Sequence, residues 1–385
     1  MKTEVMTKEI EIHGYCEPRF DAVKETFADN FRSGGDVGAS FAATINGRFA
    51  IDIWAGYADA ARMRPWKRDT LACLFSTTKA MTVLSALVLV DRGLLDLDAP
   101  VANYWPEFAQ AGKGAIPVRY LLSHQSGVAG FDERIAVEAL YDWERITTLL
   151  ARQKPWWQPG TQSGYHALTQ GYMVGEVIRR ITHRSVGTFL RDEIAGPLQA
   201  DLHLGLTAED DPRVAEMIPD PRFVSMGSLP EMVHRAMYPM VDQNNPVVFS
   251  RSRAWRAAEI PSGNGFGNAQ AVARMASALV SGEVDGIRLI GEDTIEKAFQ
   301  EQSYGVDMIL GLPLRWGLGF ILASKEMPFG PNPRTLFMGG GGGSAMIVDR
   351  DARLSMAYVM NNVIASALEG DDRAAALGRA VYAAL

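Results

Sequence analysis

The stretch FSTTKAMTVLSALVLVDR, residues 75–92, holds both a strong structural signal and a candidate reactive pair. Residues 80–90 are apolar nearly all the way round a helix, and such a helix is buried. We therefore expect a buried helix over 80–92, with Ser76 and Lys79 in its first turn. Residues three apart share one face of a helix, so a hydroxyl and an amine would meet there.

This pairing has a chemical and a structural interpretation. Burial and the positive end of the helix dipole would both lower the pKa of Lys79. A partly neutral lysine beside a serine can act as a base toward it, and nearby backbone N–H groups can stabilise an anion. In the alternative, Ser76 caps the helix and Lys79 reaches to solvent. The spacing alone does not decide, so the pair needs partners.

The first candidate partner is Tyr165. The segment QPGTQSGY, residues 158–165, places this tyrosine on a loop just before a predicted helix over 167–182. A phenol beside an ammonium can ionise more readily, so Tyr165 could relay protons with Lys79. The alternative is a tyrosine that simply packs at the start of a helix.

The second candidate partner is the glycine run Gly339–Gly343, between Met338 and Ser344. A backbone without side chains can approach a ligand closely and offer N–H donors, although it could also be a flexible turn. The run is no phosphate loop, since no Gly-Lys-Ser/Thr follows it. Neither a Gly-x-Ser-x-Gly elbow nor a His-Glu-x-x-His motif occurs, and residues 263–267 lack the full dinucleotide spacing. We therefore expect no metal and no cofactor.

The rest of the chain predicts an α+β fold. A helix over 19–33 precedes strands over 39–45 and 48–55, which the hairpin signal Asn46-Gly47 joins. Strands over 316–323, 344–348 and 354–360 and a helix over 371–384 follow near the C-terminus. Between them we expect helices over 134–152, 167–182, 186–194 and 269–281. The pattern predicts an antiparallel β-sheet flanked by helices and built from both termini, residues 1–70 and 300–385. A mainly helical domain, residues 71–299, is inserted, with the active site at the junction.

Composition excludes several classes of protein. The 385 residues are 47% hydrophobic and 22% charged with a net charge of −7, as in a globular protein with a sizeable core. No cluster of Lys and Arg suggests a nucleic-acid partner. The apolar run over 80–90 is shorter than the roughly 20 residues that span a bilayer. No apolar leader follows the N-terminal charges, so we expect a cytoplasmic protein without a membrane partner.

Taken together and in this order, these segments resemble the serine β-lactamase and penicillin-binding-protein superfamily, which carries a Ser-x-x-Lys signature. The particular likeness is to its class C-like esterase branch, the family VIII carboxylesterases. The phrases LLSHQSG, residues 121–127, and WQPG, residues 157–160, are typical of that branch. The resemblance implies that Ser76 is the nucleophile, Lys79 the adjacent base and Tyr165 the tyrosine of the second motif. It also implies an oxyanion hole formed by the backbone N–H groups of Ser76 and of a residue near Gly341.

Two departures from the β-lactamase pattern bear on the substrate. Where class C enzymes have Tyr-x-Asn, residues 165–167 read YHA, and where they have Lys-Thr-Gly, residues 338–340 read MGG. A cation there would pair with the carboxylate of a β-lactam or a peptide, whereas a thioether suits an apolar group. An uncharged ester is therefore the favoured substrate. The resemblance places the substrate beside His166, Met338, Gly339 and Gly340.

The sequence thus predicts a serine hydrolase that cleaves small carboxylic esters through an acyl-enzyme on Ser76. Three alternatives use the same acyl-enzyme: a β-lactamase, a hydrolase of amides or D-peptides, and an acyltransferase. A fourth, of a different class, is a non-catalytic relative that only binds a ligand. A small-molecule ester is the one partner that we expect.

Overall fold

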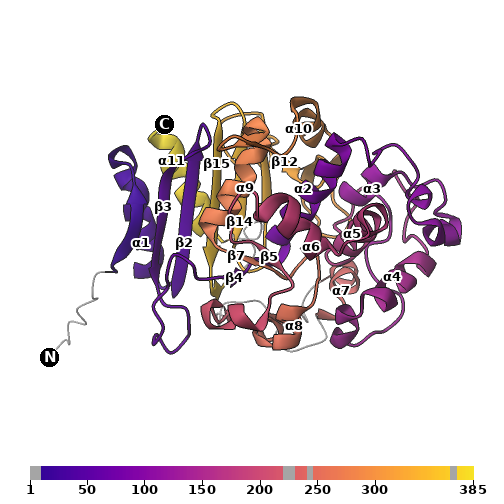
Figure 1. The fold of residues 1–385 in the computed structure, drawn as a ribbon, viewed down its shortest axis with the longest axis horizontal. Helices are drawn as coiled ribbons and strands as arrows, with labels where there is room; N and C mark the ends of the chain where they lie inside the picture. The colour runs from indigo at the N-terminus through magenta and orange to yellow at the C-terminus, as the bar shows by residue number, and fades with distance from the viewer. Residues whose placement is uncertain (1–9, 220–229, 241–245, 365–370) are drawn as a thin grey trace.

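The computed structural model describes residues 10–219, 230–240, 246–364 and 371–385. A large sheet occupies one side of the molecule, and most helices gather on the other side (Figure 1). Every neighbouring pair of its strands is antiparallel. In spatial order the sheet contains β1 (Ile12–Cys16), β3 (Arg48–Gly56), β2 (Gly38–Ile45), β15 (Leu354–Met360), β14 (Ala345–Asp349), β13 (Thr335–Gly339), β12 (Ile321–Leu322), β11 (Pro313–Trp316) and β10 (Ser303–Val306).

The centre of the sheet joins the two ends of the chain. Strand β2 pairs with β15 from Ala39↔Met360 to Ile45↔Leu354. The predicted hairpin between β2 and β3 is confirmed: Asn46 and Gly47 have φ of 53° and 76°. Two-residue turns with positive φ at both positions match the twist of antiparallel strands, which is why Asn-Gly is favoured there.

Helices cover both faces of this sheet. On one face α9 (Ala269–Ser281) contacts β15, where the Ser355 hydroxyl donates to the Ala273 carbonyl at 2.8 Å. On the other face α11 (Arg373–Ala383) lies over Met356, the next residue along β15, and packs against α1 (Asp21–Arg32). Successive strand residues point to opposite faces, so β15 is buried on both. The predicted α+β fold with its antiparallel sheet is confirmed.

The helical side surrounds α2 (Thr78–Asp91), which is buried almost all round as its composition predicts. It contacts α5 (Thr169–Thr182) and α6 (Val186–Leu190). The other helices are α3 (Val118–Leu122), α4 (Trp143–Arg152), α7 (Glu231–Met237), α8 (Arg253–Ala257) and α10 (Glu292–Phe299). A small sheet of β4 (Ala72–Cys73), β7 (Gly265–Gly267) and β5 (His203–Leu204) lies beside α2. The domain division at residues 70/71 and 299/300 stays a prediction.

Several predicted elements differ from the structure. The predicted strand over 316–323 is two antiparallel strands, β11 and β12, because a turn with Gly319 at φ 79° separates them. The predicted helix over 134–152 begins only at Trp143, where the Asp142 side chain accepts from the Arg145 N–H and caps α4. The α-helix predicted over 186–194 ends at Leu190 and continues as a π-helical turn to Ala195. Strands β1, β10 and β13 were not predicted.

In the part of the chain that the structure describes, no helix has the length and apolar character needed to cross a bilayer. The N-terminal residues that bear on a leader lie outside the described residues. The cytoplasmic location stays a prediction.

Candidate active site

Ser76 lies where the small sheet meets α2, in a short 3-10 helix, Phe75–Thr77. Phe75 just before it has φ of 44°, a left-handed conformation that is strained for a bulky residue. Two contacts from the far end of the chain hold this turn. The Ser344 hydroxyl donates to the Leu74 carbonyl at 2.8 Å and lies 3.0 Å from the Thr77 hydroxyl. Ser76 is thus fixed between the helical side and the strand pair β13–β14.

Lys79 has no exposed surface, which rules out the alternative in which it reaches to solvent. Its Nζ donates to the carbonyls of Ala167 at 2.7 Å and Ser262 at 3.0 Å, and it lies 3.3 Å from Ser76 Oγ. Burial lowers the pKa of Lys79 well below its ordinary value, as the sequence predicts. A neutral amine has two N–H donors and one lone pair. With both donors on carbonyls, the lone pair is left for Ser76.

Tyr165 completes a three-residue cluster. Its ring centroid lies 4.7 Å from Lys79 Nζ, and the Ser76 hydroxyl is close enough to influence the pKa of its phenol. Burial raises the pKa of Tyr165, and the nearby Asp307 charge adds to this, while the Ser76 hydrogen bond opposes it. The expectation that Tyr165 ionises more readily is therefore wrong. Burial thus lowers the pKa of Lys79 and raises the pKa of Tyr165, and both shifts favour the neutral form of each side chain.

Asp307 and Trp316 support Tyr165, and sequence reasoning missed both. The buried Asp307 carboxylate accepts from the Tyr165 backbone N–H at 2.9 Å and from Trp316 Nε1 at 3.1 Å. The Trp316 ring stacks on Tyr165 with 6.1 Å between centroids and 9° between planes. Asp307 interrupts the otherwise apolar run VDMIL, residues 306–310, and that isolated acid was the available signal. Asp307 and Trp316 therefore connect the large sheet to the loop that carries Tyr165.

His166 is placed differently from its predicted role. It is fully buried, its Nε2 lies 2.7 Å from the Ser126 hydroxyl, and its Nδ1 lies 2.5 Å from the Gly164 carbonyl. Burial lowers the pKa of His166 to about 4, so the ring is neutral. Contact with a substrate does not fit this geometry, because the protein uses both ring nitrogens. The His166 backbone N–H donates to His124 Nδ1 at 3.0 Å, and His124 is likewise fully buried.

The glycine run forms the turn after β13, and Met338 and Gly339 are the last two residues of that strand. The Gly340 N–H donates to the Ser344 carbonyl at 2.8 Å, and the Gly343 N–H donates to the Gly340 carbonyl at 3.0 Å. A Cβ added to Gly340 would lie 2.5 Å from the Leu74 carbonyl oxygen, so the turn passes directly beside the segment of Ser76. The Gly341 N–H has no hydrogen-bond acceptor among the described residues. Its role in an oxyanion hole stays a prediction, and Met338 is buried.

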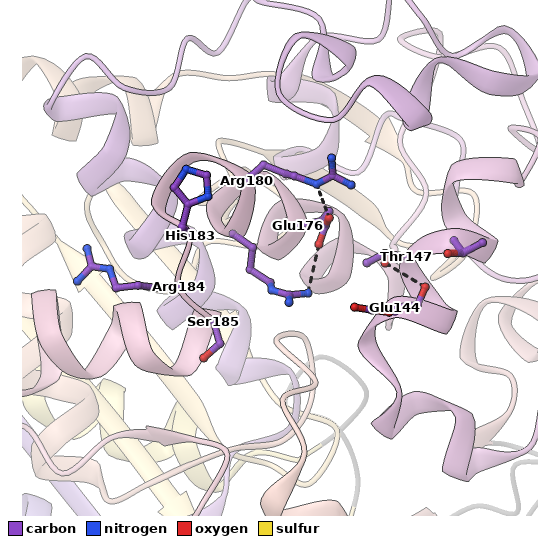
Figure 2. Close-up of a pocket in the computed structure, with 9 residues that line it drawn as sticks. Glu144, Thr147, Glu176, Arg180, His183, Arg184 and Ser185 are labelled. Atoms are coloured by element: carbon purple, nitrogen blue, oxygen red, sulfur yellow. Dashed lines mark hydrogen bonds and ion pairs between the residues drawn. The ribbon is translucent and has the colours of Figure 1, made fainter.

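A hollow of roughly 520 Å³ opens at the C-terminal end of α5, opposite the end that lies near Lys79 (Figure 2). The 14 residues of α5 make it about 21 Å long, and Ala167, whose carbonyl accepts from Lys79, precedes its first turn. The hollow lies around residues 179–185 at the C-terminal end of this helix. Among its lining residues, Glu176 forms ion pairs with Arg179 and Arg180. No group of three potential metal ligands occurs within residues 10–219, 230–240, 246–364 and 371–385.

Known proteins share this architecture along most of the chain. The family described as Beta-lactamase matches residues 26–380. Esterase/beta-lactamase LipL of Mycobacterium tuberculosis is 33% identical over 364 residues, which cover 92% of this chain and 83% of that protein. The crystal structure of a family VIII carboxylesterase is 42% identical with a TM-score of 0.89, covering 98% of this chain and 100% of that one. A penicillin-binding-protein homologue from Caulobacter crescentus is 40% identical with a TM-score of 0.91, covering 97% and 100%.

The fold, the Ser-x-x-Lys turn and these matches agree with one another. The resemblance drawn from the sequence is confirmed: this chain belongs to the beta-lactamase family.

Proposed function

We propose that this protein is a carboxylesterase that hydrolyses small, uncharged esters through an acyl-enzyme on Ser76. The observation that carries the proposal is the fully buried Lys79, whose Nζ lies 3.3 Å from Ser76 Oγ. The esterases among its relatives, LipL and the family VIII carboxylesterase, support it.

Acylation begins when the Ser76 oxygen attacks the ester carbonyl. Lys79 takes the hydroxyl proton with the lone pair that its two carbonyl contacts leave free, and becomes an ammonium. The negative charge that develops on the carbonyl oxygen faces the N–H groups of Ser76 and Gly341. Preorganised donors of this kind typically contribute 10²–10³-fold to a rate.

The leaving alcohol needs a proton when the tetrahedral intermediate collapses. The phenol of Tyr165 is near Ser76, and its ring lies beside Lys79, so the protonated phenol can donate to the alkoxide while Lys79 returns a proton to the phenol. Water then attacks the acyl group on Ser76 and gives its proton to Lys79 as the base. The acid is released, and Ser76 regains its proton.

The charges at the site favour an uncharged substrate. Met338 stands where the β-lactamase pattern has a cation, and the buried Lys79, His124 and His166 all have pKa values shifted toward their neutral forms. A carboxylate on a β-lactam or a peptide would therefore find no fixed positive partner among these groups. LipL is named as both an esterase and a β-lactamase, so slow β-lactam turnover is the second candidate activity.

Steady-state kinetics on p-nitrophenyl acetate and butyrate, with nitrocefin alongside, test the proposal. We expect ester turnover that disappears in Ser76→Ala, with nitrocefin cleaved slowly or not at all. Turnover that survives in Ser76→Ala would contradict the assignment of the nucleophile. An added alcohol acceptor shows whether transesterification accompanies hydrolysis and so identifies an acyltransferase. A folded protein that binds an ester without cleaving it would instead be a non-catalytic relative.

A further inference from the structure

A buried ion pair from near the C-terminal end of the chain lies against the glycine run. The Arg373 Nη2 and the Asp371 Oδ2 are 2.5 Å apart, and the two side chains are 6% and 2% exposed. A Cβ added to Gly343 would lie 2.2 Å from the same Asp371 oxygen and 2.7 Å from the same Arg373 nitrogen. The Gly342 carbonyl accepts from this nitrogen at 3.4 Å. We call Asp371 and Arg373 the anchor pair, because they contact the last two glycines of the run.

The anchor pair is itself held in place. The Arg373 Nη1 donates to the Gly35 carbonyl at 2.8 Å and pairs with Asp36 at 2.7 Å. Its Nη2 also donates to the Asn362 carbonyl at 3.0 Å. A planar guanidinium that uses both arms of its fork in this way has little freedom to move. The backbone that packs on it is therefore held as well.

The opposite side of the glycine run contacts the segment of Ser76. A Cβ on Gly342 would lie 2.9 Å from the Phe75 ring, and Phe75 directly precedes Ser76. Gly343 packs on the anchor pair at φ 107°, a left-handed conformation that favours glycine. A Cβ on Gly341 would meet nothing within 4 Å, so the packing of its neighbours determines where its backbone lies.

We propose that the anchor pair positions the Gly341 N–H for catalysis by holding the glycine run against the segment of Ser76. Asp371 and Arg373 are buried and act through the backbone. A backbone donor stabilises an oxyanion only within about 2.7–3.1 Å of the negative charge, so a small displacement of the run weakens its effect. This inference rests on the proposed esterase function.

A purely structural role for the anchor pair makes a different prediction. If the pair only joined the chain ends, its loss would lower the free energy of unfolding without changing how the rate depends on the carbonyl oxygen. Two substrates that differ at this atom alone separate the two roles. They are p-nitrophenyl acetate and its thiono analogue, in which sulfur, a weak hydrogen-bond acceptor, replaces the carbonyl oxygen. Both release p-nitrophenolate, which needs no proton from Tyr165.

Asp371→Asn removes one charge of the cluster without leaving another unpaired. Two carboxylates, those of Asp36 and Asp371, share the guanidinium of Arg373. Asparagine keeps the shape of the side chain and leaves the guanidinium paired with Asp36, so no buried charge is left uncompensated. The matched control is Asp372→Asn at the next residue, because the Asp372 side chain is 68% exposed and pairs with the exposed Arg379.

We expect Asp371→Asn to lower kcat/KM for p-nitrophenyl acetate by about 10–10²-fold, the cost of a donor that is displaced rather than removed. The thiono ester depends little on this donor in the wild type, so its kcat/KM should change much less. The ratio of kcat/KM for the oxygen ester to that for the thiono ester should therefore fall in Asp371→Asn. In Asp372→Asn the ratio should equal that of the wild type.

Equal losses on the two esters, or no loss on either, in a folded Asp371→Asn would overturn the inference. If this variant does not fold, Arg373→Lys takes its place, because lysine keeps the positive charge but lacks the forked guanidinium that reaches Gly342. The same fall in the ratio is then expected, and an unchanged ratio would overturn the inference.

A wild type that cleaves neither ester would instead reject the proposed function. Amide hydrogen exchange then tests the anchor pair alone. The N–H groups of Gly340 and Gly343 are hydrogen-bonded within the turn, so their exchange reports on its opening. We expect the peptide that contains residues 339–344 to exchange faster in Asp371→Asn than in the wild type or in Asp372→Asn. Unchanged exchange in a folded Asp371→Asn would overturn the positioning role.

Discussion

At the scale of single residues, the chemistry depends on the lone pair of Lys79. Burial lowers the pKa of Lys79, so the amine is neutral above that lowered pKa and takes up a proton as the pH falls through it. The protonated form has no lone pair for Ser76. We therefore expect kcat/KM for ester hydrolysis to fall as the pH drops through this lowered pKa and to hold at pH values above it.

Replacing the amine separates its basicity from its charge. Lys79→Met and Lys79→Arg should each lower kcat/KM by about 10²–10⁴-fold, the usual contribution of a general base. Arginine keeps a charge but has no accessible neutral form, so it should not rescue the activity. Comparable turnover by Lys79→Arg and the wild type would show that the amine acts only as a fixed charge.

Tyr165→Phe tests the proton donor. Its effect should depend on the leaving group, because p-nitrophenolate departs without a proton whereas an alkoxide needs one. We expect a loss of about 10²–10⁴-fold on ethyl acetate and a much smaller loss on p-nitrophenyl acetate. Tyr15→Phe, at a tyrosine that is 55% exposed, serves as the control. Equal losses on the two esters would argue against proton donation by Tyr165.

The sequence was sufficient to identify Ser76, Lys79 and Tyr165 as candidates, but not the residues that support them. The first two lie in one helical turn, and a local pattern is enough to place them together. Asp307 reaches Tyr165 across 142 residues of chain, and no local pattern encodes such a contact. The state of the phenol was misjudged for a related reason: the burial that raises its pKa comes from distant packing.

At the scale of elements, the turn after β13 gives a matched pair of substitutions. A Cβ at Gly340 would lie 2.4 Å from the Ser344 hydroxyl and 2.5 Å from the Leu74 carbonyl oxygen, whereas at Gly341 it would meet nothing within 4 Å. Gly340→Ala should lower the free energy of unfolding by about 1–3 kcal/mol, and Gly341→Ala should leave it nearly unchanged. Urea unfolding of both variants checks this, and equal stabilities would mean that the turn does not press on the segment of Ser76.

Elements with complete local signals were predicted well. Helix α9 has the predicted bounds of 269–281, since Asn268 caps its start and Gly282 ends it at φ 78°. Strand β13 was missed because it has only five residues, buried apart from the last, so no alternation of exposed and buried positions marks it. Its place is set by pairing with β14 and β12.

At the scale of the whole molecule, a buried ion-pair cluster ties the chain ends together. Arg373, at the start of α11, pairs with Asp36 at 2.7 Å and with Asp371 at 2.5 Å, and the Tyr358 hydroxyl donates to Asp36 at 2.6 Å. Removing one partner leaves buried charges uncompensated. Arg373→Met should therefore cost about 3–5 kcal/mol of unfolding free energy.

The same helix provides the control for this prediction. Arg379 pairs with Asp372 at 2.6 Å, but both side chains are about two-thirds exposed. Water and salt screen such a pair, so Arg379→Met should cost only about 0–1 kcal/mol. Similar losses in the two variants, measured by urea unfolding, would contradict the role of the buried cluster in joining the chain ends.

The most direct test of the central claim is intact-protein and peptide mass spectrometry after reaction with a fluorophosphonate. The account predicts one adduct per chain, located on Ser76, which is absent in Ser76→Ala and formed far more slowly in Lys79→Met. An adduct on another residue, or none on a folded wild type, would contradict nucleophilic catalysis by Ser76.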